Sequence, residues 1–512
     1  MKCVRRVALA VVACLSLFAC NTSGNTIAPV PAPQRTPAFF EPPVVRARNG
    51  IVSLRLTAML NPKTGVPGIS YDGALVPPTI ELSPGDTIDL AYVNALPASS
   101  KPPTNMTNLH YHGFGSSPRA PGDDVLTMMA DPGQTLHYRV ILPKNQQPGL
   151  YWYHTHPHGQ SNWQVESGLA GGIIVDGIDR QDPAVRGLVQ RVVLLQDPQD
   201  TPDYGTLLRS RRHLMAMQHN VHPFGYHPCR AEDGRHVTVN GLIGAKVAIA
   251  PGEQQFFRVA NISADRYFDL SVDGERIGLI AQDGYAVNTY PGEPDVVPVA
   301  HVLVPPAGRA EFIVTGLSHD TVLRSLCVDA GPDGDPDPNV ALITLVSTAA
   351  RASAMSPRVQ AAARPLVRNP YVSTVLPPPA VKRLMIFSEN PKTNQFYING
   401  QQFSSTGPPM FVGRTGTVEQ WRVENSTFEI HAFHIHQVHF LVESIDGVPV
   451  KRHQWLDTVN VPYATKRNGT IEPGVAVVLI DFLDPVIKGE FVFHCHILEH
   501  EDGGMMAKME VL

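Results

Sequence analysis

Hydrophobic and polar residues alternate in three segments of the chain that resemble one another. In the first, YDGALVPPTIELSPGDTIDLAYVN, the apolar residues Ile88, Leu90 and Tyr92 alternate with Thr, Asp and Ala before the segment closes on Asn94. A period of two is typical of a strand with one buried face. The pattern predicts a half-buried β-strand that ends at Asn94.

The second and third segments are VNGLIGAKVAIAPGEQQFFRVAN and INGQQFSSTGPPMFVGRTGTVEQWRVEN. In all three, a glycine stands nine residues before the closing asparagine: Gly85 and Asn94, Gly252 and Asn261, Gly416 and Asn425. A repeated local pattern predicts three related β-domains. We expect them at residues 46–180, 181–350 and 381–512, with a linker at 351–380 that is rich in Ala, Arg and Pro.

Composition agrees with this reading. The chain has 512 residues, 43% of them hydrophobic and 17% charged, so it can bury several cores. Its 47 prolines and 41 glycines favour many short strands joined by turns. The predicted fold class is therefore all-β.

The N-terminus MKCVRRVALAVVACLSLFAC has early cations, an apolar stretch and small residues before Cys20. The apolar run is too short to span a bilayer as a mature helix, which favours an export signal over residues 1–19. LFAC resembles the lipobox of bacterial lipoproteins, which implies lipid attachment at Cys20 and a periplasmic, outer-membrane-anchored protein. An ordinary signal peptide cut slightly later is the alternative. Residues 20–45 are expected to form a Pro-rich tether.

Charge and motifs exclude several classes. The net charge of −5 becomes −8 when Lys2, Arg5 and Arg6 leave with a signal that has no acidic residue. A chain with this negative net charge and no run of basic residues is not expected to bind the phosphates of nucleic acid. The chain contains neither a GxSxG elbow nor a phosphate-binding loop.

Three cysteines remain after Cys3, Cys14 and the acylated Cys20 are set aside. Cys229 and Cys327 either form a disulfide in an oxidising compartment or stay as two buried thiols; sequence leaves both open. Cys495 has no such partner. A lone exported cysteine among histidines indicates a metal thiolate.

The histidines cluster in pairs. With 21 histidines, random placement gives roughly one His-x-His pair, and this chain has five. They lie in NLHYHGFG, YWYHTHPHG, HAFHIH and FHCHI. Residues i and i+2 of a strand face the same way about 6.6 Å apart, so such pairs suit neighbouring metal ions.

The stretch FVFHCHILEHEDGGMM, residues 491–506, joins two kinds of site. On a strand, His494 and His496 point to one side and Cys495 to the other. Cys495 with two imidazoles and a weak axial methionine is the ligand set of blue copper. We expect His431 to complete this set, with His500 and Met505 supplied from the loop after the strand.

These motifs, HCHxxxHxxxxM with HxxHxH and two further His-x-His pairs, make the sequence similar to the multicopper oxidases. The resemblance implies three cupredoxin-like Greek-key β-sandwich or barrel domains and four copper ions. It implies type 1 copper at His431, Cys495, His500 and Met505, and type 2 copper at His110 and His434. It also implies two type 3 coppers, one at His112, His154 and His496, the other at His156, His436 and His494.

The resemblance further implies four one-electron oxidations of a reducing substrate, coupled to reduction of dioxygen to water. A laccase-like enzyme takes a phenol or aromatic amine. A periplasmic oxidase of cuprous or other metal ions is the alternative. The segment 211–229, rich in His and Met, is either a secondary soft-metal site or a plain loop with buried apolar residues. A two-domain copper nitrite reductase lacks the third repeat, and a non-enzymatic scaffold or copper store would have broken ligand sets.

Reduction of dioxygen needs protons, so a carboxylate is expected near the cluster. Candidates are Glu501, which follows His500, and Asp123 or Asp124 in the GDDV loop. The remaining candidates are expected to be structural: His158, His439, Met506 and Met509.

Overall fold

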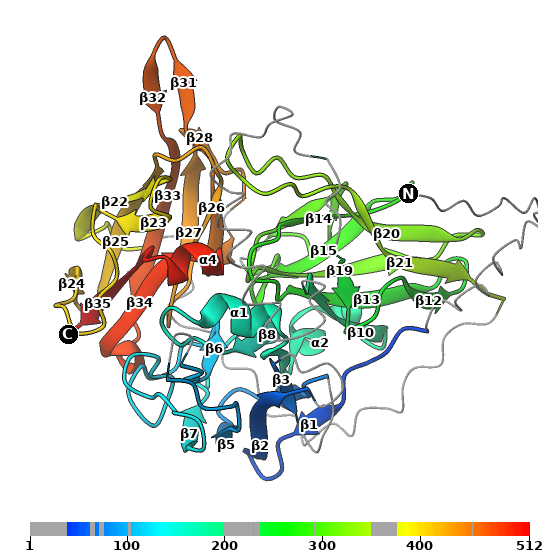
Figure 1. The fold of residues 1–512 in the computed structure, drawn as a ribbon. Helices are drawn as coiled ribbons and strands as arrows, with labels where there is room; N and C mark the ends of the chain where they lie inside the picture. The colour runs from blue at the N-terminus through cyan, green and yellow to red at the C-terminus, as the bar shows by residue number, and fades with distance from the viewer. Residues whose placement is uncertain are drawn as a thin grey trace, which may run out of the picture. The chain divides into compact units, whose positions relative to one another are not determined.

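The computed structural model describes residues 38–61, 67–70, 76–100, 104–198, 229, 236–289, 292–349, 376–452 and 454–512. They belong to one unit, Pro37–Leu512. In this part of the chain, paired β-sheets dominate and helices are short (Figure 1). The all-β fold class is confirmed.

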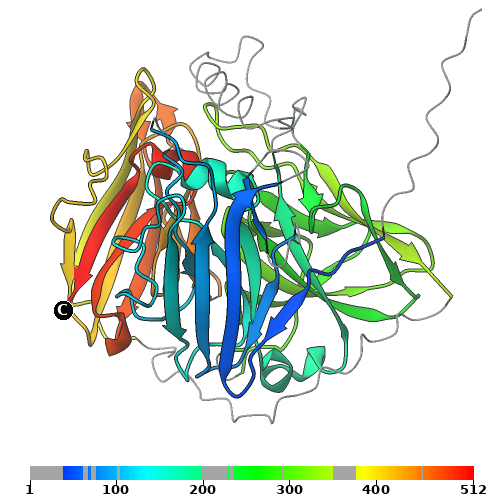
Figure 2. The ribbon, with the colours of Figure 1, turned by 60° about the horizontal axis from the view of Figure 1, so that its bottom comes forward.

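The first sandwich has one four-stranded and one five-stranded sheet among the described residues. Figure 2 shows its blue and cyan strands running side by side. The four-stranded sheet has the order β3 (Pro67–Ser70), β2 (Ile51–Leu60), β5 (Thr87–Asn94) and β7 (Thr135–Ile141). The other has the order β1 (Val44–Arg46), β4 (Thr79–Leu82), β9 (Ala170–Val175), β8 (Gly149–His154) and β6 (His110–His112).

The second sandwich repeats this plan with a seven-stranded and a five-stranded sheet among the described residues. One has the order β11 (Thr238–Val239), β10 (Val189–Gln196), β13 (Gln254–Asn261), β19 (Arg309–Thr315), β15 (Ile277–Gln282) and β16 (Tyr285–Ala286), with β17 (Val297–Val299) also on β15. The other has the order β12 (Ala245–Ile249), β21 (Val340–Ser347), β20 (Thr321–Leu326), β14 (Phe268–Val272) and β18 (Val302–Val304).

The third sandwich carries the C-terminal motifs. One sheet has the order β23 (Gln395–Ile398), β22 (Val381–Asn390), β25 (Thr417–Asn425), β33 (Gly474–Phe482), β27 (Phe440–Ile445) and β28 (Val448–Pro449), with β29 (Trp455–Leu456) also on β27. The other has the order β24 (Phe411–Gly413), β35 (Met506–Val511), β34 (Gly489–Cys495), β26 (His431–Ile435) and β30 (Thr458–Val461). A separate hairpin, β31 (Thr465–Arg467) and β32 (Thr470–Glu472), projects beyond them (Figure 1).

Short helices fill the connections: α1 (Ser161–Glu166), α2 (Ile178–Gln181), α4 (Leu498–Asp502) and the 3₁₀ turns η1 (Pro183–Val185) and η2 (Pro485–Ile487). No helix in the described ranges has the length and apolar character that a bilayer crossing needs.

The repeated glycine and asparagine have one structural role in all three sandwiches. Each glycine adopts a positive φ in the turn before its strand: 86° at Gly85, 72° at Gly252 and 80° at Gly416. Each asparagine ends that strand, at β5, β13 and β25, and its side-chain amide donates to two backbone carbonyls. Its side-chain oxygen accepts from the backbone N–H two residues on. The repeat in sequence is thus a repeat in hydrogen bonding.

The folded part begins earlier than the predicted tether allows. Ala38 forms a parallel bridge with Lys246, and Phe39 donates its backbone N–H to the same residue. Strand β1 pairs with β4 from Val44 onward. Residues 38–45 therefore add strand pairing to two sandwiches, because their backbone groups find partners there.

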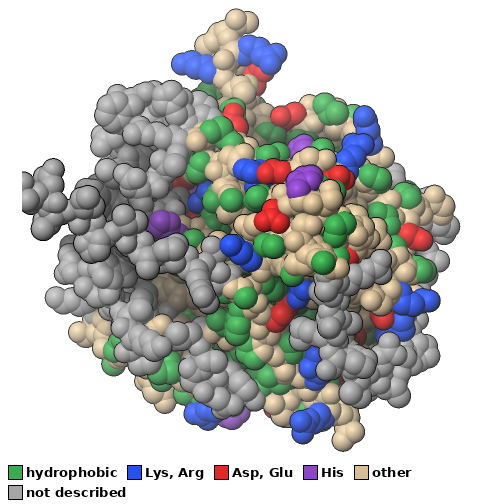
Figure 3. All heavy atoms as spheres, turned by 90° about the vertical axis from the view of Figure 1, so that its right-hand side faces the viewer, with side chains coloured by type: hydrophobic (Ala, Val, Ile, Leu, Met, Phe, Trp, Pro, Cys, Tyr) green, Lys and Arg blue, Asp and Glu red, His purple; other side chains and the backbone are tan. Residues whose placement is uncertain are grey.

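A disulfide joins Cys229 to Cys327, with Cα atoms 5.4 Å apart, which resolves the alternative that sequence left open. The tether up to residue 37, most of the linker and the His/Met-rich residues 211–228 lie outside the described residues. Among the coloured side chains of the face drawn in Figure 3, basic and acidic groups are interspersed.

Candidate metal centre

Eight histidines from the first and third sandwiches form one buried cluster. They come from β6, β8, β26, β34 and the residues just after the last three: His110, His112, His154, His156, His434, His436, His494 and His496. Each is at most 1% exposed. The cluster is therefore shielded from bulk water.

Strand register explains how residues far apart in sequence meet. His110 stands opposite His154 in the β6–β8 ladder, and His434 stands opposite His494 in the β26–β34 ladder. Between the sandwiches, the His110 and His436 rings stack with centroids 3.8 Å apart. His112 and His434 stack at 4.0 Å.

In most of these histidines a hydrogen bond holds one ring nitrogen. The held nitrogens are His110 Nδ1 (Asp123 Oδ1, 3.1 Å), His112 Nε2 (Asp457 Oδ1, 3.1 Å), His154 Nδ1 (Thr155 O, 2.9 Å), His434 Nδ1 (Asp457 O, 2.7 Å) and His494 Nδ1 (Cys495 O, 2.9 Å). The opposite nitrogens of the first four have no hydrogen-bond partner among the described residues. One held nitrogen and one unsatisfied nitrogen is the pattern of metal-ligating histidines.

Burial keeps seven of the eight imidazoles neutral. It lowers the pKa of six of them well below the usual range: His112, His154, His156, His434, His436 and His496. Burial also lowers the pKa of His494 to about 3. Neutral imidazole is the form that binds a metal ion.

The closest groupings of ligand atoms match the predicted copper sets in part. His156, His436 and His494 form one group and coincide with one predicted type 3 set. Other groups cut across the sets: His110, His112 and His154; His110, His434 and His436; and His112, His434 and Asp457. The rings of the second type 3 set, His112, His154 and His496, have centroids 5.1 to 5.9 Å apart.

A second group lies in the third sandwich. Cys495 Sγ is 3.4 Å from His431 Nδ1 and 3.7 Å from His500 Nδ1, and the two nitrogens are 3.1 Å apart. Met505 is fully buried in the same core cluster as Cys495. Three soft or borderline ligand atoms converge on one point, as a mononuclear copper site requires.

Strand β34 separates the two groups. Cys495 faces the hydrophobic core of the third sandwich, whereas His494 and His496 face the histidine cluster. This is the arrangement that alternation along a strand predicts. The two groups are adjacent along one backbone.

The prediction that His500 lies on a loop is wrong. His500 is in α4, where the N–H groups of His500 and Glu501 both donate to the carbonyl of Ile497. The helix ends at Asp502 with Gly503 as its C-cap, and Met505 follows just before β35. One helical turn therefore brings His500 back over Cys495 while Met505 stays within reach of the strand.

Glu501 is buried against the cluster. Its carboxyl oxygens lie 3.3 Å from His494 Nδ1 and 3.5 Å from His156 Nδ1, and the Ser161 hydroxyl donates to it at 2.9 Å. Burial raises the pKa of Glu501 well above its usual range. A neutral carboxyl at this place can hold a proton next to the cluster.

The two adjacent aspartates are separated by the fold. Asp123 contacts His110 Nδ1 at 3.0 to 3.1 Å and accepts from the Gln437 side chain at 3.0 Å. Asp124 instead accepts from the backbone N–H groups of Leu126 and Thr127 and from the Thr127 hydroxyl. Asp123 thus joins the cluster, and Asp124 caps a turn.

The residues expected to be structural lie around the site. His158 is close to Phe403, with ring centroids 4.7 Å apart, and His439 Nε2 lies 3.0 Å from the carbonyl oxygen of Asp283. Met506 and Met509 are buried among apolar side chains.

Three further charged residues were not found by sequence reasoning. Asp457 contacts His112, His434 and His439, and Arg309 forms two hydrogen bonds to Asp457. Glu429 lies 3.3 Å from His500 Nε2. None stands within a His-x-His motif, so spacing carried no signal for them.

A small pocket borders the cysteine group at His500. Its walls carry five carboxylates and the Tyr267 ring: Asp265, Asp335, Asp337, Glu429, Glu499 and Tyr267. The Tyr267 hydroxyl is buried without a hydrogen-bond partner among the described residues. The pocket lines the approach to His500 with carboxyl groups, of which Glu429 has its pKa raised to about 7 by burial and Asp337 lies 3.8 Å from Arg266.

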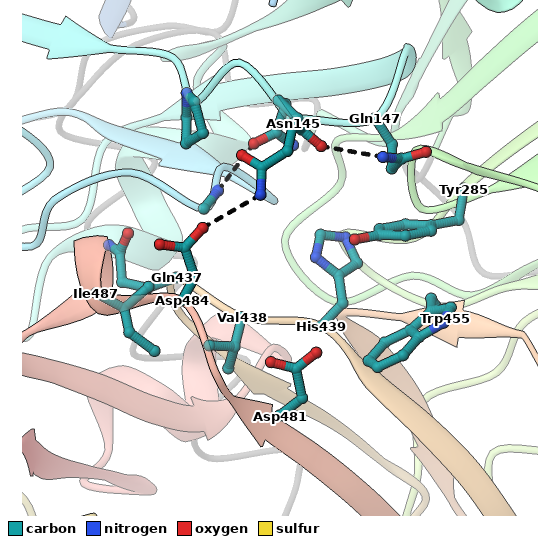
Figure 4. A pocket seen from close by; sticks show the side chains of 13 residues that line it. Asn145, Gln147, Tyr285, Gln437, Val438, His439, Trp455, Asp481, Asp484 and Ile487 are labelled. Atoms are coloured by element: carbon teal, nitrogen blue, oxygen red, sulfur yellow. Dashed lines mark hydrogen bonds between the residues drawn. The ribbon is translucent and has the colours of Figure 1, made fainter. Parts of the chain in front are cut away.

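A larger pocket, with a cavity volume of about 60 Å³, lies between parts of all three sandwiches (Figure 4). Figure 4 shows Tyr285 and Trp455 on one side, Asp481 and Asp484 facing the opening, and Asn145 bonded to Asp484. His439, in its wall, is 3.3 Å from Asp457. His439 in the pocket wall is therefore linked to the histidine cluster through a single carboxylate, that of Asp457.

Comparison with known proteins agrees with the geometry. Residues 56–180 and 376–512 each match a family model described as multicopper oxidase. The chain belongs to the multicopper oxidase family, and it is a copper-dependent oxidoreductase that uses dioxygen.

Several relatives cover most of the chain. It is 26% identical to multicopper oxidase LPR1 homolog 1 of Oryza sativa subsp. japonica, over 85% of this chain and 82% of that protein. It is 24% identical to a laccase of Bacillus subtilis, over 86% and 89%. Among solved structures, a Campylobacter jejuni multicopper oxidase described as a metallo-oxidase has a TM-score of 0.70 at 22% identity, covering 93% of this chain and 96% of that one.

Proposed function

We propose that this chain holds four copper ions and couples four one-electron oxidations of a substrate to reduction of dioxygen to two waters, with uptake of four protons. The type 1 ion would take His431, Cys495, His500 and Met505, and the type 2 ion His110 and His434. The type 3 ions would take His112, His154 and His496, and His156, His436 and His494. The unsatisfied imidazole nitrogens that face one another in a buried cluster support this assignment.

Copper would supply one-electron acceptance at Cys495 and dioxygen reduction at the cluster. The chain's own residues supply the rest. The Cys495 backbone joins the two groups through one peptide bond on either side. Glu501 and Asp123, which touch cluster histidines, are the proposed proton donors.

The carboxylate-lined pocket beside His500 favours a positively charged reductant. A neutral phenol gains little binding free energy from several carboxylates, because it has no charge for them to attract. A low-valent metal ion can take the carboxylate oxygens as direct ligands. The pocket therefore best supports oxidation of a metal ion that takes oxygen ligands, such as ferrous ion; cuprous ion, which prefers sulfur ligands, gains less there. Oxidation of phenols or aromatic amines is the second candidate, which the similarity to a laccase favours.

Oxygen uptake distinguishes the two candidates. Copper-loaded protein is given cuprous, ferrous or manganous ion, or a phenol, and the initial rates are compared. We expect metal ions to be the better substrates, with Asp335→Asn and Glu499→Gln raising KM for the metal ion about tenfold and leaving the phenol KM unchanged.

Asp89→Asn, an exposed carboxylate of the first sandwich, is the matched control and should change neither KM. Uptake with phenols alone, or an equal effect of the pocket variants on both substrates, contradicts the metal-ion assignment.

We also propose that the chain is exported and anchored by lipid at Cys20, on the strength of its N-terminal sequence. Cys20→Ala should then move the protein from the membrane fraction to the soluble fraction. A mature N-terminus that lies beyond residue 20 and carries no lipid contradicts the proposal.

A further inference from the structure

Arg309 connects the second sandwich to the histidine cluster, although that sandwich contributes none of the eight histidines. Its side chain is fully buried. The guanidinium donates to Asp457 twice, from Nη1 to Oδ1 at 2.8 Å and from Nη2 to Oδ2 at 2.6 Å. Such a paired contact fixes the plane and the position of the carboxylate.

Two further donors of Arg309 bind backbone carbonyls. Nε donates to the carbonyl of Leu150 at 3.3 Å, and Nη1 donates to the carbonyl of Ala307 at 3.1 Å. Leu150 belongs to β8, the strand that ends at His154. Arg309 therefore holds backbone of the first sandwich and a carboxylate of the third from a fixed point in the second.

Asp457, held in place by Arg309, contacts two of the cluster histidines. Its Oδ1 is 3.1 Å from His112 Nε2, and its backbone carbonyl is 2.7 Å from His434 Nδ1. The nitrogens left facing the cluster are His112 Nδ1 and His434 Nε2, both unsatisfied among the described residues. The position of Asp457 thus decides which nitrogen each ring presents.

The ion pair lies close to the backbone next to His112. A Cβ added to Gly113, which directly follows His112, would lie 2.7 Å from Arg309 Nη2 and 2.8 Å from Asp457 Oδ2. The ion pair therefore packs directly against the backbone that carries His112.

We propose that Arg309 is a positioning residue for the copper cluster: it orients Asp457 so that His112 and His434 present Nδ1 and Nε2, respectively, to the metal ions. The inference rests on the proposed copper sites. Arg309 itself touches neither substrate nor metal.

Arg258 and Glu311 provide a matched control. They form a second buried ion pair between β13 and β19, and Glu311 accepts from the backbone N–H of Leu150 at 2.8 Å. This pair resembles Arg309–Asp457 in burial and in its contact with β8. It contacts none of the eight cluster histidines.

The test compares Arg309→Lys, Arg309→Met and Arg258→Lys after loading with copper. We expect both Arg309 variants to lower kcat about tenfold or more at unchanged KM for the reductant, with Lys less damaging than Met. They should also alter the electron paramagnetic resonance spectrum of type 2 copper and lower the copper content, while the blue absorption of the Cys495 site persists. Arg258→Lys should lower thermal stability with normal spectra.

Unchanged type 2 spectra and copper content in the Arg309 variants overturn the inference, as does the same spectral change in Arg258→Lys. If Arg309→Met does not fold, Arg309→Lys and Asp457→Asn decide by the same readouts. A wild-type chain that binds no copper would instead refute the proposed function, so the two failures can be told apart.

Discussion

Cys495 and its two histidine neighbours place two kinds of metal chemistry on one backbone. The thiol is buried with Met505 in an apolar core, and the imidazoles are buried with six others in a polar cluster. An apolar surrounding suits a soft thiolate–copper bond, whereas several neutral imidazoles suit a group of copper ions. Changes of one residue should therefore affect one site and spare the other.

Cys495→Ser should abolish the blue colour of the copper-loaded protein and reduce turnover by about a hundredfold or more, because serine cannot replace the thiolate. Visible absorption and oxygen uptake measure both effects. Met506→Leu is the control, since Met506 is packed with Val125 and Val492 and the change conserves volume. A Cys495→Ser protein that remains blue contradicts the assignment.

Asp481 provides a test of pH dependence. Burial and then Asp484 raise its pKa to about 6, while the N–H of Leu483 donates to it. In the unfolded chain the pKa of this carboxyl is about 4. Between pH 4 and pH 6 the unfolded chain therefore loses the Asp481 proton while the folded chain keeps it, so the free energy of unfolding falls as pH rises.

Asp481→Asn removes this penalty and keeps the oxygen that accepts from Leu483. The variant should match wild type in thermal midpoint at pH 4 and exceed it above pH 6, in scans across that range. A difference that is independent of pH contradicts the assignment.

Helices α1 and α4 show how short elements complete the site. Residue 160, at the start of α1, makes no side-chain cap; instead Asp502 of α4 accepts from the backbone N–H groups of Ser161 and Asn162, each at 3.0 Å. A carboxylate at a helix N-terminus satisfies unpaired donors and opposes the helix dipole. The same contact holds Ser161 where its hydroxyl reaches Glu501.

Asp502→Ala should destabilise α1 by about 1 kcal/mol, because two backbone donors lose their acceptor. Hydrogen exchange of residues 161–166 should become about fivefold faster. Asp502→Asn keeps an acceptor oxygen and should exchange at a rate closer to wild type. Equal exchange in Asp502→Ala and wild type would show that the cap is not what holds α1.

The three sandwiches contribute different residues to the site. The first and third supply the eight cluster histidines, and the second supplies Arg309 and Tyr267. Tyr267 stands six residues after Asn261, just as His431 stands six residues after Asn425. A buried tyrosine thus occupies the place in the second sandwich that a proposed copper ligand holds in the third.

Copper removal tests this division. Because the proposed cluster draws its ligands from two sandwiches, stripping the metal with a chelator should lower the thermal midpoint. A ligand at a thousand times its Kd stabilises by about 4 kcal/mol, which scanning calorimetry detects. The Cys495→Ser protein should retain most of the difference, since its cluster is intact. Identical midpoints with and without copper contradict a cluster between sandwiches.

Local sequence determined a large part of this protein. A period of two dictates which side chains share a face of a strand, so the His-x-His pairs and the opposed Cys495 followed from spacing alone. The glycine–asparagine repeat likewise encodes one turn and one loop, as Asn94, Asn261 and Asn425 show.

Tertiary structure decided what spacing does not encode. Asp123 and Asp124 are neighbours in sequence, yet only Asp123 reaches His110, because the loop directs the two carboxylates to different partners. Arg309 and Asp457 are 148 residues apart and meet through the register of separate sheets. Contacts over such separations depend on how whole sandwiches pack, and no short motif carries that information.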